Sequence, residues 1–505
     1  MTRTARGSAD TPVDQPAEQR PMFDSLDPRT DEVVGRYPVH DAAEVAEIVD
    51  AARAAGRWWA DLGFAERKKR LDRWRVQLVR RLDELAGLIC AETGKPLDDA
   101  RLELVLVIDH LHWAASKAPK VLGKRKVSPG VLMANHAASV EYEPYGVVGV
   151  IGPWNYPAFT PMGSIAYALA AGNAVVFKPS ELTPGVGRWL VDTFAEVVPE
   201  QPVFSLITGF GETGAALCES GVGKVAFTGS TETGKKVMAS CAKTLTPVLV
   251  ECGGKDALIV DADADLKAAA EAALWGAMSN AGQTCIGVER VFVAEPVADR
   301  FLELLTARAK KLRPGGEPGA DLGPITMPSQ VGVIREHIQG AIDAGGRALV
   351  GGPDSVRPPF VEPVVLVDVP ADAEAHQEET FGPTVVVERV RDADEAVERA
   401  NSGRYGLGAT VFSKARGEEL ARRLRSGMVA VNSVIAFAAV PALPFGGVGD
   451  SGFGRIHGED GLREFARAKS ITRTRFRIPL NPMSFSRGAG TVRRVVQLIR
   501  ATRGR

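Results

Sequence analysis

Residues 147–178 read VVGVIGPWNYPAFTPMGSIAYALAAGNAVVFK. The first run of β-branched residues, Val147–Ile151, ends in a turn that contains prolines and aromatic residues. A stretch that suits a helix follows, and a second β-rich run, Ala174–Lys178, closes the segment. Two short apolar strands joined by a helix are typical of a parallel sheet covered by helices. The segment therefore predicts an α/β fold.

The same alternation extends over most of the chain, in two series of β-rich runs. The first series comprises 147–151, 174–178, 203–207, 225–227 and 248–251. The second series follows residue 285 and comprises 288–293, 364–367, 384–387, 409–412 and 428–431, with helical stretches such as 297–311 and 394–400 between the runs. Two series predict two α/β domains, and the paired glycines Gly253 and Gly254 mark the seam between them.

Three further segments differ from this pattern. Between residues 41 and about 122, apolar residues recur at three- and four-residue spacing, which predicts an all-helical region. Residues 124–144 contain glycine, proline and alternating apolar residues, which predicts a protruding hairpin of the kind that often joins subunits. Residues 1–24 are expected to form a flexible leader, because the first 20 residues lack the apolar core of a secretory signal.

The composition is that of a globular protein without a dominant charge. The 505 residues include 61 Lys and Arg against 62 Asp and Glu, so no global field attracts nucleic acid, and a small-molecule substrate is expected. The five cysteines form no disulfide framework and lack the paired spacing of a zinc site. We therefore expect a reducing cytoplasm and no metal. No apolar run reaches the roughly 18 residues that cross a bilayer.

The segment Asn280-Ala281-Gly282-Gln283-Thr284-Cys285 places a cysteine in a polar loop between a helical stretch and a β-rich run. A thiol in such a loop can meet a ligand. A single cysteine is, however, more often a small buried apolar side chain, so neighbouring motifs have to support a nucleophile.

Two other polar residues stand where strands are predicted to end. Glu251 closes the apolar run 248–251 just before Gly253 and Gly254, and a partly desolvated carboxylate has the raised pKa that a general base needs. Asn155 lies beyond the first strand, at the end where open α/β sheets place ligands, and its amide can donate to an oxyanion. Taken singly, Asn155 is an ordinary turn residue.

With four further motifs, these segments resemble the signature set of the aldehyde dehydrogenase superfamily. The four are Phe177-Lys178-Pro179-Ser180-Glu181, Phe227-Thr228-Gly229-Ser230, Glu379-Thr380-Phe381-Gly382-Pro383 and Pro444-Phe445-Gly446-Gly447. Their order and spacing match the family over roughly residues 25–475.

The resemblance implies two Rossmann-like parallel-sheet α/β domains plus a small β oligomerisation arm. The implied parts are a dinucleotide-binding domain (25–123 and 145–253, with 450–470 returning to it), a catalytic domain (254–449), the arm (124–144 and 471–486) and a basic C-terminal tail (487–505). It also implies a homo-oligomer, either a dimer or a tetramer.

The resemblance further implies the oxidation of an aldehyde to a carboxylic acid with NAD(P)⁺. Cys285 would attack the aldehyde, Asn155 and the Cys285 backbone N–H would hold the oxyanion, and Glu251 would activate the water that hydrolyses the thioester. The sequence does not identify what activates the thiol. A CoA-acylating enzyme needs no carboxylate base, so Glu251 argues against it, and three intact catalytic residues argue against a non-catalytic scaffold.

The implied cofactor residues are Trp154, Lys178, Ser180, Glu181, Gly211, Phe227, Gly229, Ser230, Glu379 and Phe381. The pyrophosphate is expected at Ser230 and the helix that follows it, in preference to the G-x-G-x-x-G match at residues 209–214. Lys178 and Glu181 resemble ligands of the adenosine ribose, and a carboxylate there repels a 2′-phosphate. NAD is therefore the first choice, and NADP stays open.

The resemblance places the substrate funnel near Tyr156, Thr160, Gly163 and the loop 432–440. Nearby Ile286, Ile435 and Phe437 favour an apolar aliphatic or aromatic aldehyde. The alternative is succinic semialdehyde, whose carboxylate requires a cation. Arg290 and Arg455 are candidates for that cation by sequence proximity. His457 has no metal-ligating partner and is interpreted as structural.

Beyond Ser470 the chain carries nine arginines and no acid. Val492, Val495, Val496 and Ile499 fall on one helical face of residues 491–503. The segment is suited to an anionic membrane surface or to another subunit, and a solvated terminal helix is the third alternative.

Overall fold

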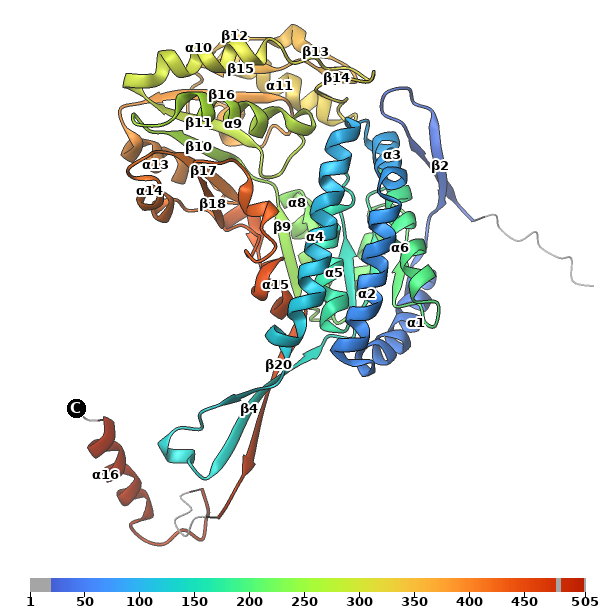
Figure 1. The fold of residues 1–505 in the computed structure, drawn as a ribbon, viewed down its shortest axis with the longest axis vertical. Helices are drawn as coiled ribbons and strands as arrows, with labels where there is room; N and C mark the ends of the chain where they lie inside the picture. The colour runs from blue at the N-terminus through green and yellow to red at the C-terminus, as the bar shows by residue number, and fades with distance from the viewer. Residues whose placement is uncertain (1–19, 478–482, 504–505) are drawn as a thin grey trace, which may run out of the picture.

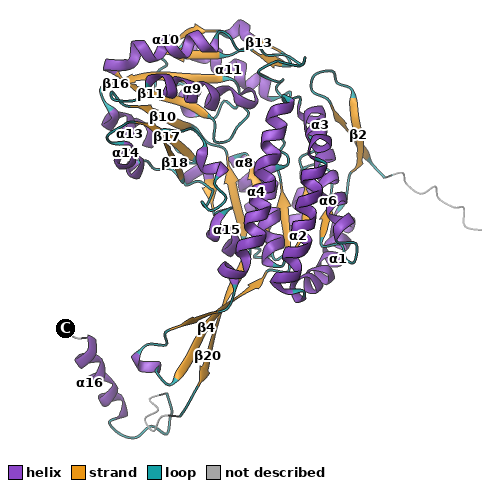
Figure 2. Cartoon of the chain, viewed as in Figure 1, coloured by secondary structure: helices purple, strands orange, loops and turns teal. Residues whose placement is uncertain are grey.

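The protein folds into two α/β bodies that share one chain and an arm that projects from them (Figures 1 and 2). The structure is a computed structural model, and it describes residues 20–477 and 483–503. The predicted fold, two parallel-sheet domains and a β arm, is confirmed.

The first body is built on a six-stranded sheet in the order β19-β9-β8-β5-β6-β7. Its strands are β5 (Val147–Ile151), β6 (Ala174–Lys178), β7 (Phe204–Leu206), β8 (Lys224–Gly229), β9 (Val248–Cys252) and β19 (Gly452–Phe453). Neighbouring strands are parallel except β19, which runs antiparallel to β9. The β-branched runs between turn residues form the strands that the sequence predicts.

Helices surround this sheet and extend the body on its N-terminal side. They are α1 (Ala42–Asp61), α2 (Gly63–Arg80), α3 (Leu82–Thr93), α4 (Leu97–Leu122), α5 (Phe159–Ala171), α6 (Pro184–Val197), α7 (Gly211–Glu219), α8 (Thr231–Ala242) and α15 (Gly458–Glu464). The predicted all-helical region is thus α1 to α4. Apolar faces bury Trp59, Trp74, Tyr167 and Phe194 in one continuous core.

The second body has a seven-stranded sheet in the order β12-β15-β16-β11-β10-β17-β18. Its strands are β10 (Asp256–Val260), β11 (Val288–Ala294), β12 (Arg347–Val350), β15 (Val364–Val367), β16 (Thr384–Val390), β17 (Gly408–Phe412) and β18 (Met428–Val431). The helices are α9 (Leu266–Met278), α10 (Ala298–Ala309), α11 (Gln330–Asp343), α12 (Glu374–Gln377), α13 (Ala393–Asn401) and α14 (Gly417–Arg423). The short strands β13 (Val356–Arg357) and β14 (Phe360–Val361) pair separately.

Strand β10 was not among the predicted strands. It follows β9 after only Gly253-Gly254-Lys255, so no helix separates the two runs. The chain passes from the first sheet to the second at these glycines.

The arm is a three-stranded sheet of β3 (Arg125–Val127), β4 (His136–Pro144) and β20 (Ala466–Thr474). Ala466 pairs with Pro144, so residues 466–470 belong to the arm and not to the dinucleotide-binding domain as predicted. The returning strand starts early because it continues directly from α15.

Near the N-terminus, β1 (Met22–Leu26) pairs with β2 (Val33–Pro38). The predicted leader therefore ends before Met22 and not at residue 24, because Phe23 pairs with Tyr37. Residues 1–19 of that prediction lie outside the described residues. At the other end, α16 (Thr491–Arg503) follows the arm. Among the described helices, none has the length and apolar character needed to span a membrane.

Candidate active site

Cys285 follows a loop of unusual backbone conformation between α9 and β11. Asn280, Ala281 and Gly282 have φ values of 53°, 54° and 73°. Non-glycine residues in this left-handed region carry a cost on the order of 1–2 kcal/mol each, so the loop needs support. Gly282 has no alternative, since a Cβ there would collide with the carbonyl oxygen of Gly382.

The side chain of Gln283 supplies much of this support. Its Nε2 donates to the carbonyl oxygens of Asn280 (3.0 Å) and Pro324 (3.1 Å), and its Oε1 accepts from the backbone N–H of Thr326 at 2.8 Å. Gln283 is 1% exposed, so these bonds are shielded from water. The loop therefore holds Cys285 in a fixed place.

Asn155 is bonded directly to the loop that carries Cys285. Its Nδ2 donates to the carbonyl oxygen of Gln283 at 2.9 Å, and its own carbonyl oxygen accepts from Asn280 Nδ2 at 3.1 Å. Among the described residues, the carbonyl oxygen of Gln283 is the one hydrogen-bond acceptor of Asn155 Nδ2. The amide carries two N–H groups, so one is left to donate to a ligand.

A buried ion pair between Lys95 and Glu103 holds the turn that contains Asn155. Lys95 Nζ lies 2.8 Å from Glu103 Oε2 and donates to the Asn155 carbonyl oxygen at 2.7 Å. Glu103 Oε1 accepts from the backbone N–H groups of Ala158 (2.8 Å) and Phe159 (3.0 Å). The sequence analysis missed this pair. The pattern that could have revealed the pair is an acidic residue, Glu103, on the buried face of α4.

Glu251, near the end of β9, is 3% exposed. Its Oε2 has no hydrogen-bond partner among the described residues, and burial raises the pKa of Glu251 to about 8. A carboxyl with this pKa accepts a proton in its ionised form, which predominates above about pH 8. The desolvated carboxylate that the sequence predicts is therefore present.

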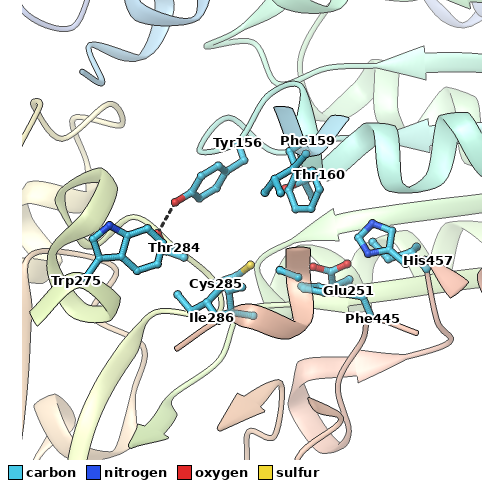
Figure 3. Close-up of a pocket in the computed structure, with 14 residues that line it drawn as sticks. Tyr156, Phe159, Thr160, Glu251, Trp275, Thr284, Cys285, Ile286, Phe445 and His457 are labelled. Carbon is cyan, nitrogen blue, oxygen red and sulfur yellow. Dashed lines mark hydrogen bonds between the residues drawn. The ribbon is translucent and has the colours of Figure 1, made fainter. Parts of the chain in front are cut away.

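Cys285 lies in the walls of two cavities, as does Thr160. The aldehyde-side cavity, of about 90 Å³, also contains Glu251 and is mainly apolar (Figure 3). Its other lining residues are Leu106, Tyr156, Phe159, Trp275, Thr284, Ile286, Ile435, Ala438, Phe445, Ile456 and His457. The cofactor-side cavity, of about 250 Å³, also contains Asn155 and the turn at Gly229 and Ser230.

The thiol of Cys285 is partly exposed to these cavities. Burial and the nearby carboxyl groups of Glu251, Glu379 and Asp256 raise its pKa well above the ordinary value. The surrounding protein groups thus favour the neutral thiol. These carboxyl groups raise the pKa of Cys285, so none of them stabilises the thiolate.

The chain matches the Aldehyde dehydrogenase family over residues 15–471. It belongs to this family. It is 39% identical over 465 residues to a 4,4'-diapolycopene aldehyde oxidase of Methylomonas sp, an alignment that covers 91% of this chain and 87% of the relative. It is 35% identical over 451 residues to a glutarate-semialdehyde dehydrogenase of Pseudomonas aeruginosa, covering 88% and 92%.

The crystal structure of PnpE in complex with nicotinamide adenine dinucleotide has the same fold. Its TM-score is 0.87 at 33% identity, and the match covers 92% of this chain and 96% of PnpE. This protein is accordingly an NAD(P)-dependent aldehyde dehydrogenase.

Five of the predicted cofactor residues of this dehydrogenase line the cavity on the cofactor side of Cys285. They are Trp154, Gly229, Ser230, Glu379 and Phe381. The rings of Trp154 and Phe381 lie 5.6 Å apart and nearly perpendicular, and Ser230 caps α8 by accepting from Thr233 N. A helix N-terminus in this wall suits a pyrophosphate. The residues present therefore fit a dinucleotide.

The other five predicted cofactor residues do not line this cavity. Phe227 packs under the turn, since a Cβ at Gly229 would stand 2.6 Å from its ring. Lys178 is buried with its Nζ 3.8 Å from the carboxylate of Glu181, and burial lowers the pKa of Lys178. Ser180 Oγ accepts from Leu182 N, and Gly211 is the first residue of α7.

The glycine-rich match at residues 209–214 stands beside Lys178 and outside the Cys285 cavity. A Cβ built on Gly214 in α7 would stand 3.7 Å from Cδ of Lys178. The preference for Ser230 over this match agrees with the cavity lining, because Ser230 is part of the wall and Gly211 is not.

On the aldehyde side, Tyr156, Thr160, Ile286 and Ile435 line the cavity as expected. Gly163 does not line it, and Phe437 is buried outside the lining, with its ring 6.5 Å from that of Phe445. Both stand directly behind the lining, because a Cβ at Gly163 would stand 2.6 Å from the lining residue His457 and Phe437 packs near the lining residue Phe445.

His457 is buried and also forms part of the wall of the aldehyde-side cavity. Its ring lies 4.0 Å from that of His110, and neither of its nitrogens has a partner in the described chain. Burial lowers the pKa of His457, so the ring is neutral. With Glu251, it adds to a mainly apolar wall a polar side chain that is unpartnered among the described residues.

Arg290 and Arg455, the candidate carboxylate ligands, do not reach this cavity. Arg290 donates to the carbonyl oxygen of Lys255 at 2.8 Å, and Arg455 donates to the carbonyl oxygens of Gly447 (2.9 Å) and Gly454 (2.6 Å). Neither arginine belongs to the lining, which among the described residues contains no Lys or Arg.

Proposed function

We propose that this dehydrogenase oxidises an apolar aldehyde to the carboxylic acid, with Cys285 as the covalent nucleophile. The observation that carries the proposal is the position of Cys285 between an apolar cavity shared with Glu251 and a second cavity shared with Asn155 and Ser230. This arrangement supports the proposal that sulfur, base and oxyanion donor act on one reacting carbonyl.

In the first half of the reaction, the thiol of Cys285 gives its proton to water, and the resulting thiolate attacks the carbonyl carbon and forms a thiohemiacetal. The free N–H of Asn155 and the Cys285 backbone N–H donate to the resulting oxyanion. When bound, the oxidised nicotinamide accepts a hydride from the reacting carbon. The product on the enzyme is a thioester of Cys285.

In the second half, Glu251 takes a proton from water, the water attacks the thioester, and the carboxylic acid leaves while Cys285 regains its proton. A buried carboxyl with a pKa of about 8 is mainly ionised, and so able to take this proton, above about pH 8. A CoA-acylating reaction needs no such base, so Glu251 favours hydrolysis.

The lining supports an apolar aliphatic or aromatic aldehyde. Each CH₂ that leaves water contributes about 0.8 kcal/mol, and Leu106, Ile286 and Phe445 offer apolar surface for it. Succinic semialdehyde is the alternative, and some relatives are named for semialdehydes. Its carboxylate would find no Lys or Arg among the described lining residues.

For the cofactor we propose NAD before NADP. Glu181 stands beside Lys178 near the N-terminus of α7, and its carboxylate would repel a 2′-phosphate. We further propose a homo-oligomer, a dimer or tetramer, because the arm of β4 and β20 projects from the body (Figure 1). Free cysteines support a cytoplasmic location.

The test is NADH formation with a panel of straight-chain, aromatic and carboxylated aldehydes, run with each cofactor. We expect kcat/KM for apolar aldehydes to exceed that for succinic semialdehyde by at least about tenfold, equivalent to ~1.4 kcal/mol. The Cys285→Ala variant should form no thioester. A preference for the semialdehyde or for NADP would overturn that part of the proposal, and an active Cys285→Ala variant would overturn the mechanism.

A further inference from the structure

The C-terminal segment lies outside the part of the chain that matches the family. That match ends at residue 471, and no Asp or Glu follows Glu464. The arginines beyond Ser470 are Arg473, Arg475, Arg477, Arg487, Arg493, Arg494, Arg500, Arg503 and Arg505. Because all 62 acidic residues precede them, the rest of the chain is net negative and this segment is strongly positive.

Helix α16 in this segment gathers its valines on one face and carries most of its arginines off that face. Val492, Val495, Val496 and Ile499 recur at the three- and four-residue spacing of one helical face. Arg493 and Arg500 lie on one flank of that face, Arg494 lies on the opposite side of the helix, and Arg503 follows at the C-terminal end of the face. No residue of α16 is buried, and Val492 and Val496 are 50% and 41% exposed.

A helix of this kind needs a surface to cover it. Isolated helices shorter than about 12–15 residues are marginal in water, and β-branched valines lower that stability further. The described part of the chain does not bury the apolar face of α16. A surface that covers this face and also pairs with the neighbouring arginines is both apolar and anionic.

We propose that α16, together with the exposed side chains of Met483 and Phe485, binds the surface of an anionic lipid bilayer. Apolar residues enter the acyl boundary while flanking arginines reach lipid phosphates, which accept several N–H bonds from each guanidinium. Met483 is 74% exposed and Phe485 is fully exposed. This contact does not depend on the substrate of the enzyme.

The position of α16 fits such a contact. Figure 1 shows α16 at the end of the chain beyond β20, beside the outer end of the arm and apart from the two α/β bodies. The chain before Ile471 is net negative and is repelled by an anionic surface, so the basic helix meets the bilayer first.

The experiment is co-sedimentation of the full-length protein with vesicles. We expect binding to phosphatidylglycerol-containing vesicles at low salt, little binding to pure phosphatidylcholine, and release at high salt. Val496→Glu places a charge on the apolar face and should weaken binding at least about tenfold. Gln497→Glu, the matched control, makes the same change of charge on the polar face and should weaken binding less than about threefold.

Aldehyde oxidation of both variants should equal that of the parent protein, which shows that they fold. Failure of the parent protein to bind anionic vesicles at low salt would overturn the proposal, as would equal loss in Val496→Glu and Gln497→Glu. Light scattering measures the oligomeric state of the same variants. If vesicles retain none of the parent protein and Val496→Glu changes the oligomeric state, the proposal is overturned, and the apolar face of α16 packs against another copy of the chain.

Discussion

Gly163 and His457 are complementary across the wall of the aldehyde-side cavity. A Cβ at residue 163 would stand 2.6 Å from Nε2 of His457, closer than such atoms approach in proteins. Hence the imidazole of His457, held at φ 60° at the start of α15, occupies the space that glycine leaves in α5.

The first prediction is that Gly163→Ala displaces His457 into the cavity. We expect unfolding to become easier by about 1–3 kcal/mol, the range for overpacking a core, and kcat/KM for apolar aldehydes to fall. Denaturant unfolding and steady-state kinetics measure both effects. Gly340→Ala is the matched control, because Gly340 lies in helix α11 with open space around it. Equal effects of the two variants would refute the steric relationship.

The second prediction concerns Asn155→Ala. Loss of an oxyanion donor lowers kcat by about 10²–10³ in comparable sites, and the hydrogen bond to the carbonyl oxygen of Gln283 is lost as well. Single-turnover formation of NADH reports the affected step. Unchanged turnover would remove Asn155 from the mechanism.

The strands show how far the sequence could predict this fold. The bounds of β5, β6, β15 and β18 agree with prediction, because short β-branched runs stand between clear turn signals. Strand β10 was not predicted, because the helix that normally separates successive parallel strands is absent where the chain passes from one sheet to the other. A strand is predicted from the turn and helix signals that flank it in the sequence. Here the preceding element, β9, belongs to a different sheet, and no helix signal separates it from β10.

In the site, the motifs indicated Cys285, Glu251 and Asn155, and the structure gathers them around two cavities. The groups that hold them were not predictable from local patterns. Lys95 reaches the backbone of Asn155, and Gly163 accommodates His457, across long separations in the sequence. Such contacts arise only after the chain has folded, so the residue types alone do not identify them.

The third prediction tests the ion pair under the Asn155 turn. Glu103→Gln leaves the buried ammonium of Lys95 without its counter-charge, and breaking such pairs costs about 3–5 kcal/mol. The double variant Lys95→Met, Glu103→Gln should recover part of that loss, because no charge stays buried. Denaturant unfolding of the parent protein and three variants completes the cycle. A double variant with the full sum of the single losses would refute coupling between the two groups.

The last prediction follows from the raised pKa of Glu251. Below about pH 8 this carboxyl is mostly protonated and cannot accept a proton from water, so hydrolysis of the thioester should rise with pH and level off above that value. Glu251→Gln should retain the initial burst of NADH and lose steady-state turnover at every pH. The same shift lowers stability: a carboxyl that ionises at 4.5 when unfolded and at about 8 when folded costs about 1.4 kcal/mol per pH unit across that window. Glu251→Gln should therefore resist denaturant better than the parent protein toward about pH 8, with the gain shrinking toward about pH 5. A difference that does not change with pH would show that the carboxyl ionises normally in the fold, and the assignment of Glu251 as a desolvated base would fail.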